Sequence, residues 1–170
     1  MVELVENIID NKIRSNSNSI NLVGEFYAMS RLFLEGYEAS LTLGNTKGVD
    51  ILLFNPKNNK QFRVEVKTSS SILNEKTFGG KNIRWFMNKK HEELNDDSLV
   101  FCFIFVDKKE KSYKIFFVPS KEVAEYCKWE NKHWIEAEHK KPIDETGQMR
   151  SFRIKLDESS KWENNFSFFD

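Results

Sequence analysis

The sequence feature that most constrains the fold is an uninterrupted apolar run of eight residues, Leu99 to Val106. A continuous run of this length predicts a buried strand. A second apolar run, Val49 to Phe54, is interrupted only by Asp50. The segment Phe62 to Thr68 alternates between apolar and charged side chains, which predicts a strand with one buried face. These three segments are expected to share one sheet.

The order of the predicted elements indicates the fold class. Helical spacing predicts a helix ending near Gly36, with an apolar face formed by Leu22, Phe26, Met29 and Phe33. The elements expected after it are strands over 37–43, 49–54 and 62–68, a loop, strands over 99–106 and 113–118, a helix over 119–129, and a late strand over 152–156. This order predicts an α/β domain around one mixed sheet.

Length and composition exclude several classes of protein. The 170 residues are expected to form a single domain, with a core over about 20–130 and a C-terminal extension over 131–170. No apolar run approaches the about 18 residues of a membrane span, and the acidic N-terminus does not resemble a signal peptide. The two cysteines, Cys102 and Cys127, are expected to be buried thiols. The expected location is therefore cytoplasmic.

Positive charge is concentrated in one part of the chain, although the net charge is zero. Between residues 57 and 90, nine basic side chains face only two acidic ones, Glu65 and Glu75. A local positive field of this kind can attract an anionic partner. Within this part, residues 69–90 are rich in serine, glycine and lysine, and they are expected to form a mobile loop with a short helix over 86–94.

Charged residues inside the central strands indicate a site, because a charge in an apolar strand needs a specific reason. The polar loop Asn55–Lys60 and the pair Asp50 and Glu65 share the same midpoint in the sequence. A simple hairpin therefore places the two carboxylates opposite each other, with about 5 Å between their Cβ atoms. A divalent cation would remove their repulsion, and Mg²⁺ suits carboxylate oxygens. Lys67 shares the face of Glu65 and can reach a water molecule or a phosphate oxygen beside the ion.

Motifs around these charged residues resemble those of a known family. The matching segments are Gly24-Glu25, Gly44-Asn45, Gly48-Val49-Asp50 and Val64-Glu65-Val66-Lys67-Thr68. In these motifs the chain is similar to the PD-(D/E)XK nuclease superfamily, which has an αβββαβ core with a central mixed sheet flanked by helices. Restriction endonucleases, Holliday-junction resolvases and repair nucleases belong to it. The residue before Asp50 is Val49 instead of proline, a departure that members of the family often show.

The resemblance implies a role for each of these residues. Asp50 and Glu65 are expected to bind the metal together with Val66, Lys67 to orient or activate the water, and Glu25 to assist from the helix. Mg²⁺ is the implied cofactor, and Mn²⁺ is expected to substitute for it. The residues expected to contact nucleic acid are Lys47, Thr68, Ser69, Lys76, Lys81, Arg84, Lys89 and Lys90.

The expected function is that of a Mg²⁺-dependent endonuclease acting on DNA, of restriction, resolvase or repair type, with RNA left open as a substrate. Two alternatives are a non-catalytic nucleic-acid-binding module of the same fold and a protein-interaction domain whose basic loop binds an acidic partner. Cleavage of both strands of a duplex calls for two sites, which favours a homodimer. Its expected interface is the aromatic tail, formed by Trp162, Phe166, Phe168 and Phe169. His91, His133 and His139 are expected at the surface.

Overall fold

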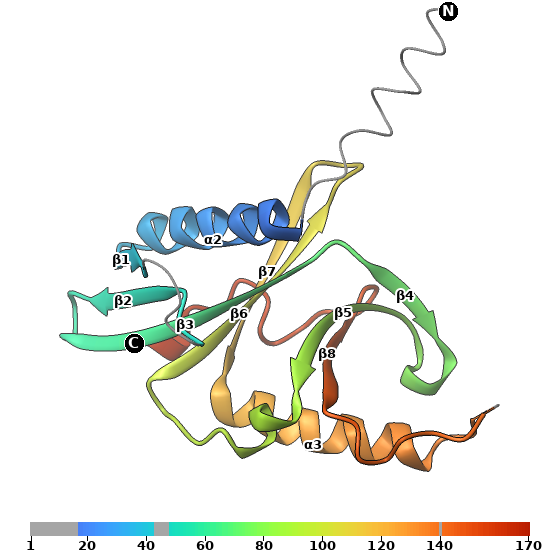
Figure 1. The fold of residues 1–170 in the computed structure, drawn as a ribbon. Coiled ribbons are helices and arrows are strands. Elements are labelled where there is room, and N and C mark those ends of the chain that lie inside the picture. Colours follow the sequence, from blue (N-terminus) through green and yellow to red (C-terminus); the bar gives the residue numbers. More distant parts are fainter. Residues whose placement is uncertain (1–16, 43–47, 140) are drawn as a thin grey trace, which may run out of the picture.

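The computed structural model describes residues 17–42, 48–139 and 141–170, which form two sheets and two helices (Figure 1). The larger sheet has the strand order β1-β2-β3-β6-β7, and the smaller one has the order β4-β5-β8. The elements in chain order are α2 (Ser17–Leu34), β1 (Glu38–Leu41), β2 (Ile51–Asn55), β3 (Lys60–Ser69), β4 (Ile72–Glu75), η1 (Lys76–Phe78), β5 (Gly80–Asn88), η2 (Lys89–Glu93), β6 (Leu99–Asp107), β7 (Ser112–Pro119), α3 (Ser120–Glu136), β8 (Met149–Lys155) and η3 (Ser167–Phe169). None of the helices described is long and apolar enough to cross a membrane.

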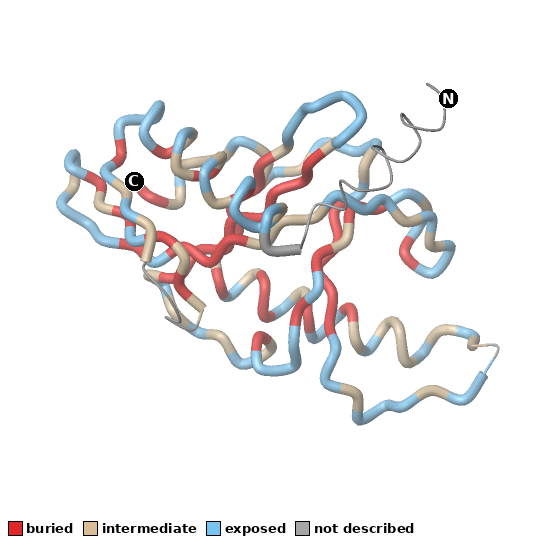
Figure 2. The backbone as a smooth tube through the Cα atoms, turned by 45° about the horizontal axis from the view of Figure 1, so that its top comes forward, coloured by how far each residue is buried: buried red, intermediate tan, exposed pale blue. Residues whose placement is uncertain are grey.

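The larger sheet is mixed, because β3 runs parallel to β6 while the other neighbouring strands are antiparallel. Strand β6 is buried over almost its whole length, and its residues alternate between two hydrophobic cores. Figure 2 shows the buried parts of the backbone gathered in the middle of the molecule. Val100 and Cys102 belong to the core under α2, whereas Phe101 and Phe103 belong to the core formed with β5, β8 and α3. The α/β fold class, the central mixed sheet and the buried strand are confirmed. The prediction of one sheet is wrong, because the late strand β8 belongs to a second, antiparallel sheet with β4 and β5. Both cysteines are buried thiols, as expected.

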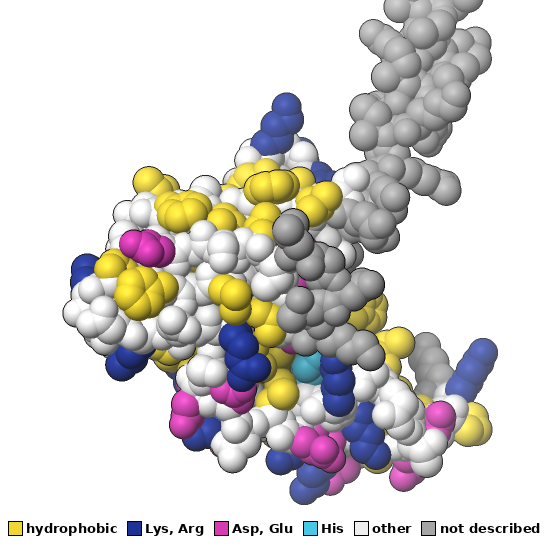
Figure 3. Space-filling model, turned by 60° about the vertical axis from the view of Figure 1, so that its left-hand side comes forward, with side chains coloured by type: hydrophobic (Ala, Val, Ile, Leu, Met, Phe, Trp, Pro, Cys, Tyr) yellow, Lys and Arg dark blue, Asp and Glu magenta, His cyan; other side chains and the backbone are white. Residues whose placement is uncertain are grey.

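Helix α2 packs on the sheet through a different face from the one expected. Ala28 and Leu32 are fully buried, and Gly24 lies so close to β3 that a Cβ atom there would be 1.9 Å from Thr68 Oγ1. This face of small residues lets the helix approach the sheet closely. Most of the apolar stripe expected to face the core is therefore exposed, namely Leu22, Phe26 and Phe33. Figure 3 shows hydrophobic side chains at the surface in the upper part of the molecule, at the level of α2.

Most of residues 69–90 form a β-hairpin, so the prediction of a loop is wrong. Strand β4 pairs with β5, and β5 pairs in turn with β8 from the other end of the chain. The alternating residues Ile83, Trp85 and Met87 of β5 are buried against the larger sheet, and Trp85 Nε1 donates to the Ile104 carbonyl oxygen at 2.9 Å. The helix expected over 86–94 is replaced by the end of β5 and the 3₁₀ turn η2.

The aromatic C-terminal residues pack against the core of their own chain, which makes them unsuitable as a dimer interface. Phe169 is fully buried, and its carbonyl oxygen accepts hydrogen bonds from Asn55 Nδ2 at 2.8 Å and Asn58 Nδ2 at 3.1 Å. Phe166 packs against Phe117, with 4.8 Å between the ring centroids. Phe168 and Trp162 are partly buried against the two cores. The expected interface is therefore wrong, because these rings complete the chain's own interior.

Candidate active site

Strands β2 and β3 pair in the register that the midpoint of the loop predicts. Strands β2 and β3 pair with Ile51 opposite Val64, and the same register continued by one residue places Asp50 opposite Glu65. The main-chain N–H of Asp50 donates to the Val64 carbonyl oxygen at 2.9 Å. The predicted register is confirmed. Because β2 begins only at Ile51, none of the described strands pairs with the edge of β3 beyond Val64 on this side.

A cleft of about 310 Å³ opens at this edge of β3. Its walls come from α2, from the segment before β2, from β3 and from the middle of β5, where Trp85 and Phe86 lie. The four side chains for which the sequence predicts a catalytic role all line it, namely Glu25, Asp50, Glu65 and Lys67. The fold thus brings together residues that are up to 42 positions apart in the sequence.

Asp50 is half-buried in the cleft, where its Oδ2 accepts a hydrogen bond from the Val66 main-chain N–H at 2.7 Å. Burial raises the pKa of Asp50 and the charge of Glu65 adds to the rise, while the Val66 N–H and the Lys67 ammonium act against it. An extended residue directs its N–H and C=O toward the same side of the strand. The carbonyl group of Val66 therefore faces the same open edge as the N–H that binds Asp50.

Glu65 is buried and ionised. Burial raises its pKa, but His91 and the Lys67 ammonium more than offset burial and bring the pKa to about 2. The Lys67 Nζ atom lies 2.5 Å from Glu65 Oε1. The two carboxyl groups of the site therefore have pKa values shifted in opposite directions, a pattern common where carboxylates take different roles.

Glu25 reaches the same cleft from helix α2. Burial raises the pKa of its carboxyl group, and the negative charge of Asp50 raises it further. The effect of Asp50 shows that the two carboxylates lie within electrostatic reach of each other. Glu25 therefore lies in the same cleft, close enough for its charge to interact with that of Asp50.

The structure places the residues expected to contact nucleic acid in different environments. Lys47 lies outside the described residues. Thr68 Oγ1 is buried under Gly24 and has no hydrogen-bond partner in the described structure, so it is not presented to a phosphate. Ser69 Oγ caps the main-chain N–H of Ser71 at 3.2 Å. The exposed side chains of this set are Lys76, Lys81, Lys89 and Lys90.

Arg84, the remaining member of this set, is only partly exposed. It lies 3.6 Å from Glu75, and its guanidinium carbon lies 4.8 Å from the centre of the Phe86 ring. Phe86 is itself exposed and lines the cleft. Arg84 is therefore near the mouth of the cleft but already has a carboxylate partner.

His91 is the residue near the site that sequence reasoning missed. It was expected at the surface, but the structure buries it beside Glu65, with Nε2 at 3.9 Å from Oε1. The only signal in the sequence was the spacing of Asn88 and His91, which form a capping box at the start of η2. That spacing predicts a turn and says nothing about Glu65, because the path of β5 across the sheet is a tertiary feature.

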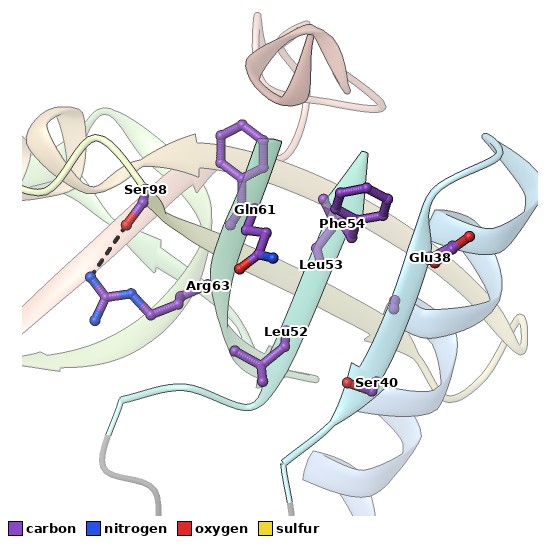
Figure 4. Close-up of a pocket in the computed structure, with 10 residues that line it drawn as sticks. Glu38, Ser40, Leu52, Leu53, Phe54, Gln61, Arg63 and Ser98 are labelled. Carbon is purple, nitrogen blue, oxygen red and sulfur yellow. Dashed lines mark hydrogen bonds between the residues drawn. The ribbon is translucent and has the colours of Figure 1, made fainter. Parts of the chain in front are cut away.

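A larger cavity, of about 650 Å³, lies on the outer face of β1, β2 and β3 (Figure 4). Glu38 is the one carboxylate among the residues that line it. Arg63 points toward Ser98 and forms an ion pair with Asp96, so its charge is already balanced. This groove has neither a pair of carboxylates nor an unpaired cation among its lining residues, and the smaller cleft remains the candidate for chemistry.

The donor atoms of the cleft fit a hard cation. Gly48 has a φ of +76°, and a Cβ atom there would lie 3.3 Å from Glu65 Oε2, so glycine leaves this oxygen accessible. The Lys67 ammonium on Oε1 already shows that Glu65 binds a positive charge here. Across the described ranges, no three His, Cys, Asp or Glu side chains converge on one point. Mg²⁺ commonly uses only one or two carboxylates and keeps water molecules, so the lack of a third such side chain does not conflict with this ion.

Comparison with known proteins supports the fold. No protein-family model matches the sequence, and no curated protein matches it. Among solved structures, the chain is similar to a bacterial homing endonuclease, I-Ssp6803I, with a TM-score of 0.51 and 9% sequence identity over 88% of this chain and 87% of the other. At this identity the likeness concerns the fold alone. The chain therefore has an α/β, endonuclease-like core.

Proposed function

We propose that the protein is a Mg²⁺-dependent endonuclease of the PD-(D/E)XK type, which hydrolyses phosphodiester bonds of DNA. The observation that carries this proposal is the arrangement of Asp50, Glu65 and Lys67 around one cleft, at the open edge of β3. The similarity of the fold to a homing endonuclease supports the same class of reaction. DNA is favoured over RNA as the substrate because that neighbour is a homing endonuclease.

The proposed chemistry assigns one task to each group. Asp50, Glu65 and the Val66 carbonyl oxygen would hold the Mg²⁺ ion. When bound, Mg²⁺ polarises a phosphate oxygen and makes a bound water molecule more acidic. Lys67 orients the attacking water and stabilises the negative charge that develops on the phosphate. Glu25 holds a water molecule of the site from the side of helix α2.

A second candidate is a nucleic-acid-binding module of the same fold without catalysis. The ion pair between Lys67 and Glu65 favours it, because each charge already satisfies the other. In that case the exposed lysines of the β4–β5 hairpin and η2 would bind the phosphate backbone, and the acidic residues of the cleft would stabilise the fold. Binding without cleavage in every metal ion is the outcome that supports this candidate.

A cleavage assay with matched variants tests the proposal. Supercoiled plasmid, linear duplex, junctions, single-stranded DNA and RNA are incubated with Mg²⁺, Mn²⁺ or EDTA. Asp50→Asn and Lys67→Ala are each expected to lower the cleavage rate at least about a hundredfold. The control variants Asp97→Asn and Lys57→Ala change exposed groups of the same charge and are expected to cleave normally. Cleavage by Asp50→Asn at the wild-type rate would falsify the assignment.

We also propose that the active form is a homodimer, because cutting both strands of a duplex requires two such sites. The aromatic tail packs into the core of its own chain, so a dimer needs another surface as its interface. The exposed apolar side chains of α2 are the surface on which two copies are expected to meet, with Phe26 61% and Phe33 53% exposed. Apolar side chains grouped on one helix face are typical of interaction surfaces.

A further inference from the structure

His91 is buried in the interior next to the proposed site. Its side chain is 5% exposed, and the edge of its ring packs on Phe101, with 5.7 Å between the ring centroids. Its Nδ1 atom lies 2.9 Å from the main-chain nitrogen and 2.8 Å from the carbonyl oxygen of Asn88. One side of the imidazole is therefore fixed by the turn that ends β5.

The other ring nitrogen has no hydrogen-bond partner among the described residues. It faces Glu65, and its distance of 3.9 Å from Oε1 is too long for a hydrogen bond. The same oxygen is in contact with Lys67 Nζ at 2.5 Å. Two donors therefore converge on a single carboxylate oxygen, and only one of them is bonded in this structure.

The hydrogen bond at Nδ1 of His91 determines whether Nε2 is a donor or an acceptor. If Nδ1 accepts the main-chain N–H of Asn88, as in the capping box, a neutral ring carries its proton on Nε2. The opposite tautomer would turn a lone pair toward an ionised carboxylate. With this tautomer the group facing Glu65 is an N–H donor, and a buried donor without a partner among the described residues needs an explanation.

The proposed reaction supplies that explanation. When Lys67 turns toward the water and the phosphate in the proposed reaction, its ammonium moves away from Glu65 Oε1. We propose that His91 is a positioning residue that then donates to Glu65 Oε1 in place of Lys67. This inference rests on the proposed function. A shift of about 1 Å shortens the distance to that of an ordinary hydrogen bond.

The exchange has a clear consequence for Glu65. Without a second donor, departure of Lys67 would leave Oε1 buried and unpaired, and the carboxylate would be free to rotate. With His91 in place, the carboxylate keeps its orientation, and Oε2 stays turned toward Gly48 and the cleft. Partners that orient a ligand in this way typically change metal affinity or activity by about 10- to 100-fold when removed.

Two substitutions separate this role from simple packing. His91→Phe keeps a flat ring against Phe101 and removes the donor, whereas His91→Gln restores an N–H donor on a flexible chain. The Mg²⁺ concentration at half-maximal thermal stabilisation and the kcat and KM for DNA cleavage are measured for both. The Phe variant is expected to need about 10- to 100-fold more Mg²⁺ and to lose kcat rather than KM, and the Gln variant to recover most of the loss. Equal values for both variants and the wild type would overturn the proposal.

A spectroscopic measurement tests the exchange without any activity. In Lys67→Met the ammonium is absent, so His91 should bond to Glu65, and its Nε2–H proton should appear downfield and protected from exchange in a ¹H–¹⁵N spectrum. The signal should be lost in the double variant Lys67→Met/Glu65→Ala. If Lys67→Met shows no such proton, the exchange is wrong even if the protein cleaves DNA. If the proton appears but the wild type cleaves nothing, the proposed function fails and the contact stands.

Discussion

At the scale of single residues, the buried charge of Asp50 lowers the stability of the fold but has a role in the proposed chemistry. Burial raises the pKa of its carboxyl group, so this group costs folding free energy as the pH rises through that pKa. Asp50→Asn removes the charge but keeps an oxygen that can accept the Val66 N–H. We expect the variant to unfold in EDTA at a temperature equal to or above that of the wild type.

The same substitution should abolish the response to metal. At a hundredfold excess over its dissociation constant, Mg²⁺ is expected to stabilise the wild type by about 2.7 kcal/mol, or about 5–10 °C for a chain of this length. Thermal unfolding of both proteins in EDTA and in Mg²⁺ measures the two effects together. A wild-type response to Mg²⁺ in Asp50→Asn would remove Asp50 from the metal site.

Glu65 is expected to control the acid stability of the fold. Its pKa is about 2 in the folded protein and near 4.5 without these contacts, so the unfolded chain takes up the proton first. The stability that ionised Glu65 contributes is complete above about pH 4.5 and is lost as the pH falls toward 2. Urea unfolding between pH 2 and 7 measures the difference in free energy of unfolding between the wild type and Glu65→Gln. That difference should shrink steadily below pH 4.5, and a constant difference would contradict the shifted pKa.

At the scale of elements, Gly24 determines how helix α2 meets the sheet. A Gly→Ala change inside a helix normally stabilises it by about 1 kcal/mol. Here the new Cβ would lie 1.9 Å from Thr68 Oγ1, so the helix has to move. Gly24→Ala is expected to cost about 1–3 kcal/mol, which thermal unfolding detects. Thr68→Ala in the same chain should recover part of the loss, while the exposed control Ser30→Ala should have little effect.

The β4–β5 hairpin and η2 carry the lysines expected to bind phosphate. Lys89 and Lys90 are exposed at the start of η2, two positions or fewer from His91. Replacing both by alanine should weaken DNA binding regardless of sequence and lower the slope of log K against log salt by about 0.9 for each phosphate that is no longer neutralised. Lys109→Ala, on the exposed turn between β6 and β7, is the matched control. An unchanged slope would show that these lysines do not bind the DNA backbone.

The contrast between confirmed and wrong predictions has a physical cause. The opposition of Asp50 and Glu65 was predictable because a short loop between two strands sets their register locally. The packing face of α2 was not predictable, because the helix approaches the sheet through Gly24, against Thr68. The apolar stripe lies on another face of the helix and gives no sign of this contact. The burial of His91 was equally hidden, since it follows from β5 crossing to the sheet and pairing with β8.

At the scale of the whole molecule, the exposed face of α2 can be tested as the dimer contact. Light scattering at micromolar concentration is expected to give twice the chain mass of 20.1 kDa. The double variant Phe26→Ser/Phe33→Ser should be monomeric, because it removes two exposed rings from the same helix. Phe86→Ser changes an equally exposed ring on β5 and should remain dimeric. A wild-type protein of single-chain mass would contradict the dimer.

The place of Phe169 has a consequence for how this chain is made. Its ring contacts Tyr37, Phe62 and Phe117, which belong to the start and the middle of the fold. During translation, the space for that ring stays unfilled until residues 166–170 have been synthesised and have packed. The core under α2 therefore cannot close when its helix and the strands β1 to β3 have emerged, but has to wait for a segment about 100 positions further along the chain.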